Sequence, residues 1–579
     1  MKTKALVSEL FFNKTKIMIL YTLNSIGLVV FGIAGVVLIG KLIDNVIVPS
    51  DQSYLSLLLT LLAIDAVMLV GMMFLKEKQV SNITSNVATG IAKNAHEALL
   101  KAELSDVEKE GVSELAENIF ENSMAISERY VKKNMLTLID KSIYILTLFL
   151  TLIFVKPILC VILFASLPFF YLITRSLTKH CQKASQKVQD NKDKVNKAIK
   201  NMSKNVRNVK LMNGIDYEID DFEALTSEFT AAKENSDMLN FINETAVEKI
   251  ITLLVTLICT GVCAWLAIDP FFGMDAGTLF IFVSLIPVTF LTFTSLMKVE
   301  IGFGSVEKEA EELDKILSLH SEMKSEPVNI IEEIHSLKFI DVTYSKHPKT
   351  NVIEGISFEL KRGEKLGIIA DDDAKDAIFD VLTKLSKPKQ GYVSINNCDI
   401  NKINTSYLRE LITSIFDSST IYDDTIMNNI AYPATFDDYK YNDALNKSGL
   451  KDIIATLPDR DNTIVSDDSE LITQDIKNRM VFANAFYKDS KIFVLNEATK
   501  DFDINTEAEI LNEVFKLKSK IIVMLTDKVY NLSRCDKILI IQEGKITEYG
   551  KYDDLLHDKN SYFYKLIKKG SLSKRQNIS

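Results

Sequence analysis

The sequence lacks the basic excess of a nucleic-acid-binding protein. Its 67 Lys and Arg residues stand against 77 Asp and Glu, and the formal net charge is −10. Because recognition of nucleic acid usually needs a basic face, we expect no nucleic-acid partner. The six cysteines are scattered and no histidine cluster accompanies them, so neither a disulfide framework nor a metal site is predicted. Cys259 and Cys263, four apart in an apolar run, should share a helix face as small hydrophobic residues.

A small-residue cleavage site is also missing after the first apolar stretch, which favours an uncleaved membrane anchor over a signal peptide. Stretches of about 20 mostly apolar residues are long enough to cross a bilayer. Six such stretches are present, approximately at 17–40, 55–76, 134–155, 157–177, 247–269 and 276–297. Asp65 lies near the middle of the second. An intramembrane carboxylate usually faces a cavity or a partner, so Asp65 is either a substrate contact or a residue paired with a neighbouring helix.

Lys and Arg are absent from the loops that follow the first and fifth stretches, "DNVIVPSDQSY" and "DPFFGMDAG". The segments after the second and fourth stretches are rich in them, which predicts a multi-pass plasma-membrane protein with both termini in the cytoplasm. These two segments exceed fifty residues and contain few Gly or Pro, so long helices should continue out of the membrane. We expect a transmembrane domain over 1–300, a helical linker over 301–333 and an α/β domain over 334–579.

Glycine is missing where the α/β domain would carry a phosphate-binding loop. The stretch "KLGIIADDDAKDAIFDVL" reads as a strand, a short loop and a helix, but the loop from Ala370 to Ala377 holds three consecutive aspartates and no glycine. Glycines in such a loop let backbone N–H groups converge on phosphates. Two unit charges 4 Å apart interact by about 4 kcal/mol at an effective dielectric constant of 20, so these aspartates should repel a triphosphate.

Framework segments in a fixed order resemble the ATP-binding cassette (ABC) exporters. They are "VIEGISFELKRGEKLGII" (352–369), "LRELITSIFDSSTIYDDTIMNNI" (408–430), "KIFVLNEATKDFD" (491–503) and "CDKILIIQEGKITEYGKYDDLL" (535–556). In the first half, "NVRNVKLMNGIDYEIDDF" (205–222) is similar to the family's second cytoplasmic coupling segment. The resemblance covers nearly the whole chain. It implies an exporter-type bundle of six transmembrane helices followed by an α/β nucleotide-binding domain of the P-loop type.

The resemblance assigns roles to positions whose residues mostly differ from the family's. Counting back from Pro388 places Lys375 at the phosphate-binding lysine, whereas an ungapped alignment places Asp376 there. Glu497 occupies the position of the family's general base. It is either a catalytic residue, a relic of that role or a hydrogen-bonding residue. The candidate nucleotide-contacting positions are Tyr344 or Lys346 for the adenine, Ala370, Asp371, Asp372, Asp373, Ala374, Lys375, Asp376 and Ala377 in the loop, Asp417 for the metal-associated glutamine, Thr473, Gln474 and Asp475 in the signature segment, Asn496 for the magnesium-associated aspartate and Asp527 for the switch histidine.

These differences predict that the chain binds ATP and Mg²⁺ weakly or not at all and hydrolyses little or no ATP itself. The resemblance implies a half-transporter, surrounded by membrane lipid, that pairs with a second ABC half able to bind ATP. A heterodimer is favoured, and a homodimer is the alternative. The substrate class would be a peptide, a lipid or a drug-like molecule. Two other functions stay open: a non-transporting receptor, immunity or regulatory protein on a retired exporter fold, and an ordinary ATP-driven homodimeric exporter.

Overall fold

The computed structural model describes residues 15–109, 112–268, 275–302, 306–322, 331–346, 350–416, 421–466 and 472–568. The chain divides into two compact units. The first, here called the membrane unit, comprises residues 1–99 and 113–318, and the second, the cassette unit, comprises residues 100–112 and 319–579. The segment 100–112 therefore packs with the cassette unit although it is encoded within the first half of the chain.

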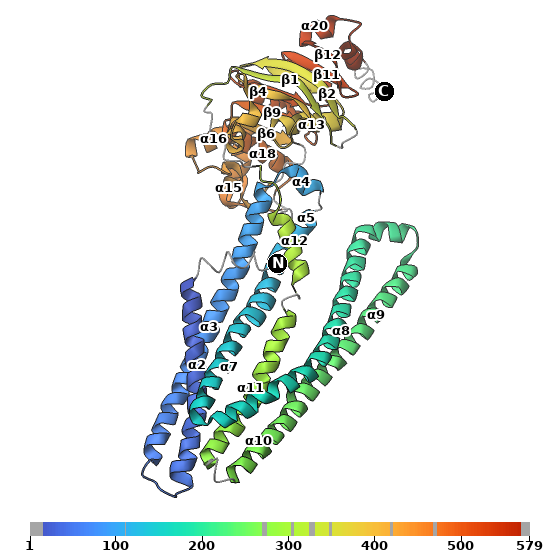
Figure 1. The fold of residues 1–579 in the computed structure, drawn as a ribbon. Coiled ribbons are helices and arrows are strands. Elements are labelled where there is room, and N and C mark those ends of the chain that lie inside the picture. The colour runs from blue at the N-terminus through green and yellow to red at the C-terminus, as the bar shows by residue number, and fades with distance from the viewer. Residues whose placement is uncertain are drawn as a thin grey trace. The chain divides into compact units, whose positions relative to one another are not determined.

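The membrane unit is helical, and several of its helices are long (Figure 1). They are α2 (Thr15–Leu42), η1 (Ile43–Ile47), α3 (Leu55–Lys101), α5 (Val112–Glu117), α6 (Ile119–Ala125), η2 (Ile126–Leu136), α7 (Thr137–Val155), α8 (Pro157–Leu211), α9 (Ile215–Ile242), η3 (Asn243–Ile251), α10 (Thr252–Ile268), α11 (Ala276–Gly302) and α12 (Glu307–Leu317).

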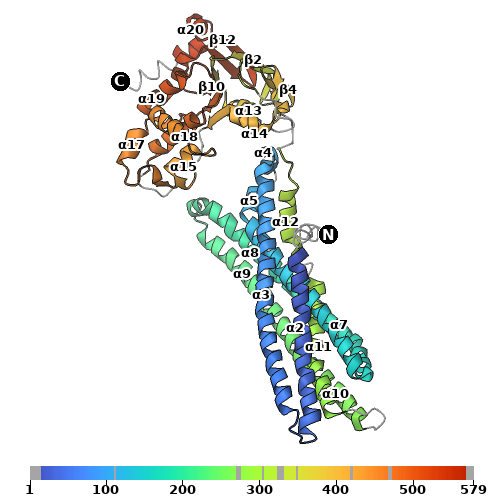
Figure 2. The ribbon, with the colours of Figure 1, turned by 90° about the vertical axis from the view of Figure 1, so that its left-hand side faces the viewer.

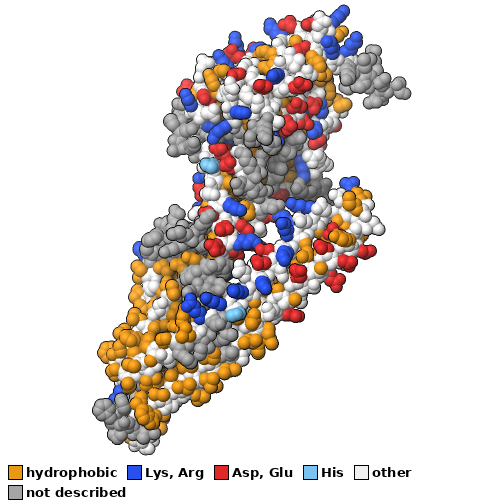
Figure 3. Space-filling view, turned by 45° about the vertical axis from the view of Figure 1, so that its right-hand side comes forward, with side chains coloured by type: hydrophobic (Ala, Val, Ile, Leu, Met, Phe, Trp, Pro, Cys, Tyr) orange, Lys and Arg blue, Asp and Glu red, His pale blue; other side chains and the backbone are white. Residues whose placement is uncertain are grey.

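Five stretches in the described residues are long and apolar enough to cross a membrane: Lys16–Ile47, Leu55–Leu100, Ile119–Val155, Lys249–Leu266 and Ala276–Val299. They confirm five of the six predicted spans. The remaining one, 157–177, forms the start of α8, where only some of the side chains are described. On the face drawn in Figure 3, hydrophobic side chains cover the end of this unit that holds the spans, as a lipid-facing surface requires.

Helices α8 and α9 pack along one another as a long hairpin (Figure 2). Its tip corresponds to the predicted coupling segment, and it exposes apolar side chains: Leu211 is 75% exposed, Met212 83% and Tyr217 76%. Within the bundle, Cys259 and Cys263 are buried in one apolar cluster with residues of α2, α7, α8 and α11, as expected of small hydrophobic residues on one helix face.

Two close helix contacts explain polar and glycine positions in the spans. Asp44 accepts a hydrogen bond of 2.6 Å from the N–H of Gly277, at the start of α11. A Cβ atom on Gly277 would collide with the carbonyl oxygen of Gly40, so α2 and α11 approach too closely for any larger residue. Asp65 is buried on α3, and a Cβ atom on Gly35 would come within 2.8 Å of its carboxylate. Asp65 therefore faces the neighbouring helix α2.

The cassette unit contains two main sheets. One is antiparallel, in the order β2-β1-β4-β5, and the other has the order β12-β11-β3-β10-β9-β6, with β11, β3, β10, β9 and β6 parallel. The strands are β1 (Ser336–Tyr344), β2 (Ile353–Lys361), β3 (Lys365–Ile369), β4 (Gln390–Ile395), β5 (Cys398–Asp399), β6 (Ile412–Phe416), β9 (Ile492–Asn496), β10 (Ile521–Leu525), β11 (Lys537–Gln542) and β12 (Lys545–Lys551), and a separate pair is β7 (Asp424–Thr425) with β8 (Ile464–Val465).

Strands β9 and β10 are buried at every residue, which is why their sequences "IFVLN" and "IIVML" are almost entirely apolar. The helices of the cassette unit are α4 (Leu104–Lys109), α13 (Asp372–Leu382), η4 (Ile400–Lys402), α14 (Thr405–Leu411), α15 (Ile426–Ala431), α16 (Asp438–Ser448), α17 (Lys451–Thr456), η5 (Arg460–Asn462), α18 (Gln474–Lys488), α19 (Ile504–Phe515), η6 (Val529–Arg534) and α20 (Tyr552–His557). In an open parallel sheet, ligand sites lie beyond the carboxyl ends of the strands. The ends of the adjacent strands β3, β10 and β9 are therefore the place to examine.

The segment 100–112 is joined to the cassette unit by main-chain bonds. Ala102 and Ser321 form an isolated antiparallel bridge. The N–H of Glu103 donates to the carbonyl of His320 at 2.9 Å, and the N–H of Glu322 donates to the carbonyl of Lys101 at 2.8 Å. This bridge explains why the segment packs with the cassette unit.

Candidate functional site at the carboxyl ends of β3, β9 and β10

The loop without glycine forms a helix start that is satisfied by the chain itself. Asp371 is the N-cap of α13, and its carboxylate accepts a hydrogen bond of 2.8 Å from the N–H of Ala374. Three alanines of this loop are buried: Ala370, Ala374 and Ala377. A helix N-terminus attracts anions because its first N–H groups have no partner within the helix. In this protein the carboxylate of Asp371 takes the position of the anion.

Lys375, in the first turn of α13, ends among three carboxylates. Its Nζ atom lies 2.6 Å from Oε1 of Glu497, 2.9 Å from Oδ1 of Asp527 and 2.9 Å from Oδ1 of Asp372. These four residues are here called the Lys375 cluster. The Lys375 side chain is only 1% exposed. An ammonium group has three hydrogen-bond donors, and the three carboxylates match that number. A phosphate could therefore reach Nζ only by displacing one of them.

The three carboxylates differ in how firmly they hold Lys375. The side chain of Glu497 is 12% exposed, whereas those of Asp372 and Asp527 are 87% and 68% exposed. An exposed ion pair is typically worth about 0–1 kcal/mol, and breaking a buried one costs roughly 3–5 kcal/mol. The contact between Lys375 and Glu497 is thus the main one in the cluster.

Glu497 reaches this position through an unusual backbone conformation. Its φ is +49°, in the left-handed region that few non-glycine residues adopt. The N–H of Glu497 donates to the carbonyl of Leu525 at 2.9 Å, and Oε1 accepts a second hydrogen bond, of 2.8 Å, from the N–H of Asp527. The residue predicted as a general base therefore acts here as a hydrogen-bond acceptor between β9 and β10.

Asp376 and Asn496 form a second contact between the same helix and strand. Nδ2 of Asn496 donates to Oδ1 of Asp376 at 2.8 Å, and Asn496 is buried. The resemblance places a hydroxyl and a magnesium-associated aspartate at these positions. Of the two residues that the alternative alignments place at the lysine position, Lys375 reaches Glu497 and Asp376 contacts Asn496. At these positions the side chains of Asp376 and Asn496 form an amide–carboxylate hydrogen bond.

The contacts of the cluster shift the pKa values of Lys375 and Asp372 toward their charged forms. Burial lowers the pKa of Lys375, but hydrogen bonds with Glu497, Asp372 and Asp527 outweigh burial and raise it above the usual range of lysine. The hydrogen bond and the charge of Lys375 lower the pKa of Asp372. Both shifts favour the charged forms, so Lys375 and Asp372 stay ionised at neutral pH.

The remaining predicted nucleotide contacts lie apart from the cluster or outside the described residues. Nζ of Lys346 lies 4.0 Å from Oδ1 of Asp373, whose side chain is 74% exposed. The hydroxyl of Tyr344 contacts that of Ser386 at 3.3 Å. Asp417 lies outside the described residues.

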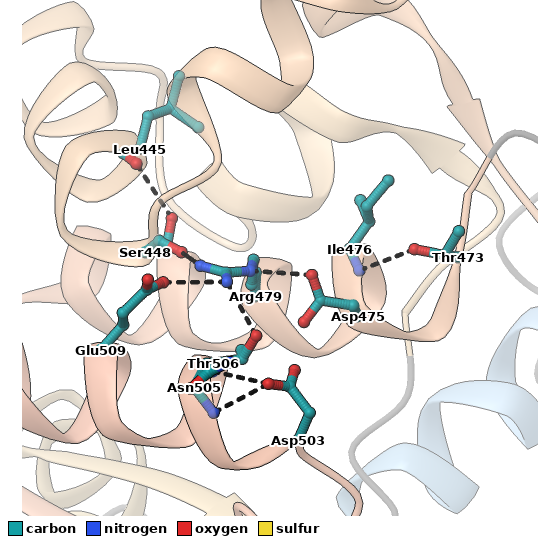
Figure 4. A network of polar contacts seen from close by, with 10 residues as sticks. All are labelled: Leu445, Ser448, Thr473, Asp475, Ile476, Arg479, Asp503, Asn505, Thr506 and Glu509. Atoms are coloured by element: carbon teal, nitrogen blue, oxygen red, sulfur yellow. Dashed lines mark hydrogen bonds and ion pairs between the residues drawn. The ribbon is translucent and has the colours of Figure 1, made fainter.

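The signature segment is also closed by its own side chains (Figure 4). Thr473 is the N-cap of α18, and its hydroxyl oxygen accepts from the N–H of Ile476 at 3.4 Å. Asp475 accepts a hydrogen bond of 3.0 Å from Nε of Arg479. Gln474 donates to Asn478 at 2.9 Å. Where the family pattern has two glycines, this helix start presents a carboxylate and an amide, each with a partner of its own.

Sequence reasoning missed Arg479, whose side chain is 10% exposed. Beyond Asp475, it donates to the carbonyl of Ser448 at 3.0 Å, to Thr506 at 2.9 Å and to Glu509 at 3.1 Å. These contacts tie the start of α18 to α16 and α19. An arginine four residues after an aspartate on one helix was the available signal.

Two family models match the chain. One is described as the ABC transporter transmembrane region, over residues 18–293, and the other as ABC transporter, over residues 353–500. They match the membrane unit and the cassette unit in turn, and the second includes the loop from Ala370 to Ala377 and the end of β9.

Curated relatives extend over most of the chain at low identity. A putative export ATP-binding/permease protein from Rickettsia typhi is 23% identical over 580 residues, 96% of both chains. An ATP-dependent lipid A-core flippase from Wigglesworthia glossinidia brevipalpis is 22% identical over 496 residues, 84% of both chains. A beta-(1→2)glucan export ATP-binding/permease protein from Bartonella bacilliformis is 27% identical over 244 residues, 42% of this chain and 41% of the relative.

Among solved structures, a bacterial Atm1-family ABC exporter with ATP bound superposes with a TM-score of 0.76. It covers 95% of this chain and 98% of its own, at 18% identity, and so it establishes the fold. With the transmembrane region and the ABC domain fused in one polypeptide, the chain has the half-transporter architecture of the ABC exporter family.

Proposed function

We propose that this chain is an ABC-exporter half whose own nucleotide site is closed by its side chains and which pairs with a second ABC half that binds ATP. The observation that carries the proposal is the Lys375 cluster, in which three carboxylates occupy the ammonium that would bind phosphate. ATP would have to displace these carboxylates and would be repelled by their charge. Two unit charges 4 Å apart repel each other by about 4 kcal/mol at an effective dielectric constant of 20. Binding of ATP and Mg²⁺ by this chain is therefore weak or absent.

The signature segment supports the same proposal. In ABC dimers, the family resemblance implies that the signature of one subunit faces the ATP of the other. In this chain that surface would offer Thr473, Gln474 and Asp475, and the carboxylate of Asp475 is held in an ion pair with Arg479. The chain then contributes shape and membrane helices to the complex, and the partner contributes ATP binding. A heterodimer is favoured over a homodimer, because a homodimer would have two closed sites.

The tip of the α8–α9 hairpin supports pairing. Leu211, Met212 and Tyr217 are exposed together at this tip, and a subunit contact would cover them. The distribution of Lys and Arg supports placement in the plasma membrane with both termini in the cytoplasm. The substrate is a peptide, a lipid or a drug-like molecule. The relatives include a lipid A-core flippase, which makes a lipid one member of that set.

Affinity purification of the tagged chain from its native membranes tests the pairing. The proposal expects an ABC half with intact phosphate-loop glycines to co-purify and the complex to hydrolyse ATP. A stable homodimer that works without nucleotide would instead favour a non-transporting regulatory or receptor protein. Robust Mg-ATP hydrolysis by this chain alone, abolished by Glu497→Gln, would identify an ordinary homodimeric exporter and overturn the proposal.

A further inference from the structure

One side of helix α8 carries a row of basic side chains at the end of the stretch 157–177, which is predicted to cross the membrane. Helix α8 runs without interruption from Pro157 to Leu211, so residues four apart lie on the same side of it. The row, here called the basic stripe, covers a sector of about 120° and comprises Arg175, Lys179, Lys183 and Lys187. All four side chains are exposed.

Helix α9 packs against the opposite side of α8. Cys181 and Ala184 are buried there. Sγ of Cys181 donates to the carbonyl of Leu239 at 3.3 Å, and the hydroxyl oxygens of Ser185 and Ser236 lie 3.4 Å apart. At about 100° per residue, Cys181, Ala184 and Ser185 project away from the stripe. The stripe therefore faces away from α9.

The chain's own carboxylates do not neutralise the stripe. The sequence holds no Asp or Glu from residue 141 to residue 189. In the part of the chain that the structure describes, the three lysines of the stripe take part in no ion pair or hydrogen bond, and Arg175 lies over the ring of Tyr171, 5.4 Å from its centroid. Further along α8, by contrast, Nζ of Lys194 lies 3.7 Å from Oε2 of Glu228 on α9. The stripe thus offers cationic donors that have no acceptor.

The position of the stripe along α8 matches the lipid headgroup layer. A bilayer has a hydrocarbon core about 30 Å thick and a total thickness of about 40–45 Å, so headgroups occupy roughly 5–8 Å on each side. At about 1.5 Å per residue, Lys179 and Lys183 lie about 3 and 9 Å beyond residue 177. Arg175 reaches the same layer from inside, because long basic side chains extend to the interface. On the face drawn in Figure 3, Lys and Arg side chains gather where the hydrophobic cover of the spans ends.

The same side of α8 is apolar and exposed within the predicted span. Val161 and Leu172 are exposed, and the helical period places both in the sector of the stripe. An apolar surface therefore continues directly into the basic one. A molecule with an apolar tail and an anionic head matches both surfaces, whereas a free phosphate matches the stripe alone.

We propose that the basic stripe binds the headgroups of acidic phospholipids. The phosphate oxygens accept charge-assisted hydrogen bonds from Lys179 and Lys183, and an acyl chain lies along Val161 and Leu172. The inference rests on the membrane placement proposed above and is independent of ATP binding and of subunit pairing. A bound acidic lipid would fix the depth of α8 in the bilayer.

Native mass spectrometry of the full-length chain in a nonionic detergent, titrated with phosphatidylglycerol and in parallel with phosphatidylcholine, tests the proposal. Tighter binding of phosphatidylglycerol is expected. Each basic residue near an acidic headgroup strengthens binding about fivefold, so Lys179→Gln/Lys183→Gln should weaken phosphatidylglycerol binding about tenfold or more. Both lysines are exposed, so this variant should fold. Lys192→Gln/Lys197→Gln is the matched control: it removes two exposed lysines from the same helix, about 20 Å farther from the span, and should leave the affinity unchanged.

Four results would overturn the proposal: equal affinity for the two lipids, unchanged phosphatidylglycerol binding in Lys179→Gln/Lys183→Gln, equal weakening by both double variants, or release of bound phosphatidylglycerol by inorganic phosphate at the same concentration. The last result would identify a site for free phosphate. The assay contains no nucleotide and does not depend on orientation in a bilayer, so its failure leaves the proposed function standing. Binding of Mg-ATP by the chain alone would overturn the proposed function and leave the lipid site standing.

Discussion

Nζ of Lys375 lies 2.6 Å from Oε1 of Glu497, and neither side chain is more than 12% exposed. The family resemblance assigns the first residue to phosphate and the second to the attacking water. In this chain they bind each other, and Asp527 and Asp372 complete the set of acceptors. The residues at the positions that perform ATP chemistry in the family therefore contact one another.

The first prediction concerns the stability of the cassette unit. Lys375→Met should lower the free energy of opening of α13 by roughly 3–5 kcal/mol, because it leaves Glu497 buried without its cation. Hydrogen exchange of α13 amides in the full-length chain measures this. The double variant Lys375→Met/Glu497→Leu should recover most of the loss, since replacing both members of a buried pair with apolar residues is often neutral. Lys389→Met, an exposed lysine, is the control. If Lys375→Met lowers the free energy of opening of α13 no more than Lys389→Met does, then Lys375 does not stabilise this helix.

The contact between Asp376 and Asn496 makes a second prediction. Asn496→Asp should destabilise the unit by about 1–3 kcal/mol, because two carboxylates would then meet where the amide now donates at 2.8 Å. Adding Asp376→Ser should recover stability by restoring a donor. Thermal unfolding of the single and double variants checks this order. Equal stability of wild type and Asn496→Asp would show that the pair does not hold the loop.

Arg479 gives a third prediction. Arg479→Lys keeps the charge but cannot reach Asp475, Ser448, Thr506 and Glu509 together, because it lacks the planar fork of donors. We expect a loss of about 1–3 kcal/mol in the unfolding free energy of the cassette unit. Lys477→Arg, two residues away at a half-buried position of α18, should have little effect. If both variants unfold alike, the network in Figure 4 is not what secures the signature segment.

The fourth prediction concerns pH. Burial raises the pKa of Glu507, but hydrogen bonds from Thr499, Tyr530, Lys528 and Asn531 outweigh it, and the net pKa is lowered. A carboxyl whose pKa is lower in the folded state stabilises the fold above its unfolded pKa, about 4.3, and this stabilisation is lost as the pH falls through the folded pKa. The melting temperature of the cassette unit should therefore fall below about pH 4.3.

The variant Glu507→Gln should lose stability at neutral pH and show a shallower decline in acid. Glu332→Gln removes an exposed carboxylate and serves as the comparison. Measuring melting temperature from pH 7 to acid for the three proteins distinguishes the contributions. An acid limb that is as steep in Glu507→Gln as in wild type would rule out Glu507 as its source.

Much of the fold follows from the sequence, because it depends on patterns within single elements. Apolar length predicts five spans that the structure confirms, and the scarcity of Gly and Pro over 178–246 predicts the long hairpin helices. The match of both family models agrees with the predicted order of a membrane half and an ABC half.

The site was less predictable, because its contacts join residues more than a hundred positions apart. The sequence placed Lys375 and Glu497 in their motifs but not against each other, and it suggested that the aspartates of the loop would simply face solvent or ligand. In the structure, Asp371 caps α13 and Asp372 pairs with Lys375. The joint occurrence of Asn496 with Asp376, and of Asp527 with a retained lysine, was the signal that the substitutions compensate one another. The segment 100–112 was also beyond sequence reasoning, since its bridge to Ser321 is set by tertiary contacts.

Direct titration of the purified full-length chain with Mg-ATP tests the central claim, that its own carboxylates occupy the phosphate-binding lysine. The account predicts no saturable binding of Mg-ATP at concentrations up to well above 1 mM. A dissociation constant of about 1 mM corresponds to a binding free energy of only about −4 kcal/mol. Saturable binding with a dissociation constant below about 1 mM, abolished by Lys375→Met, would contradict it.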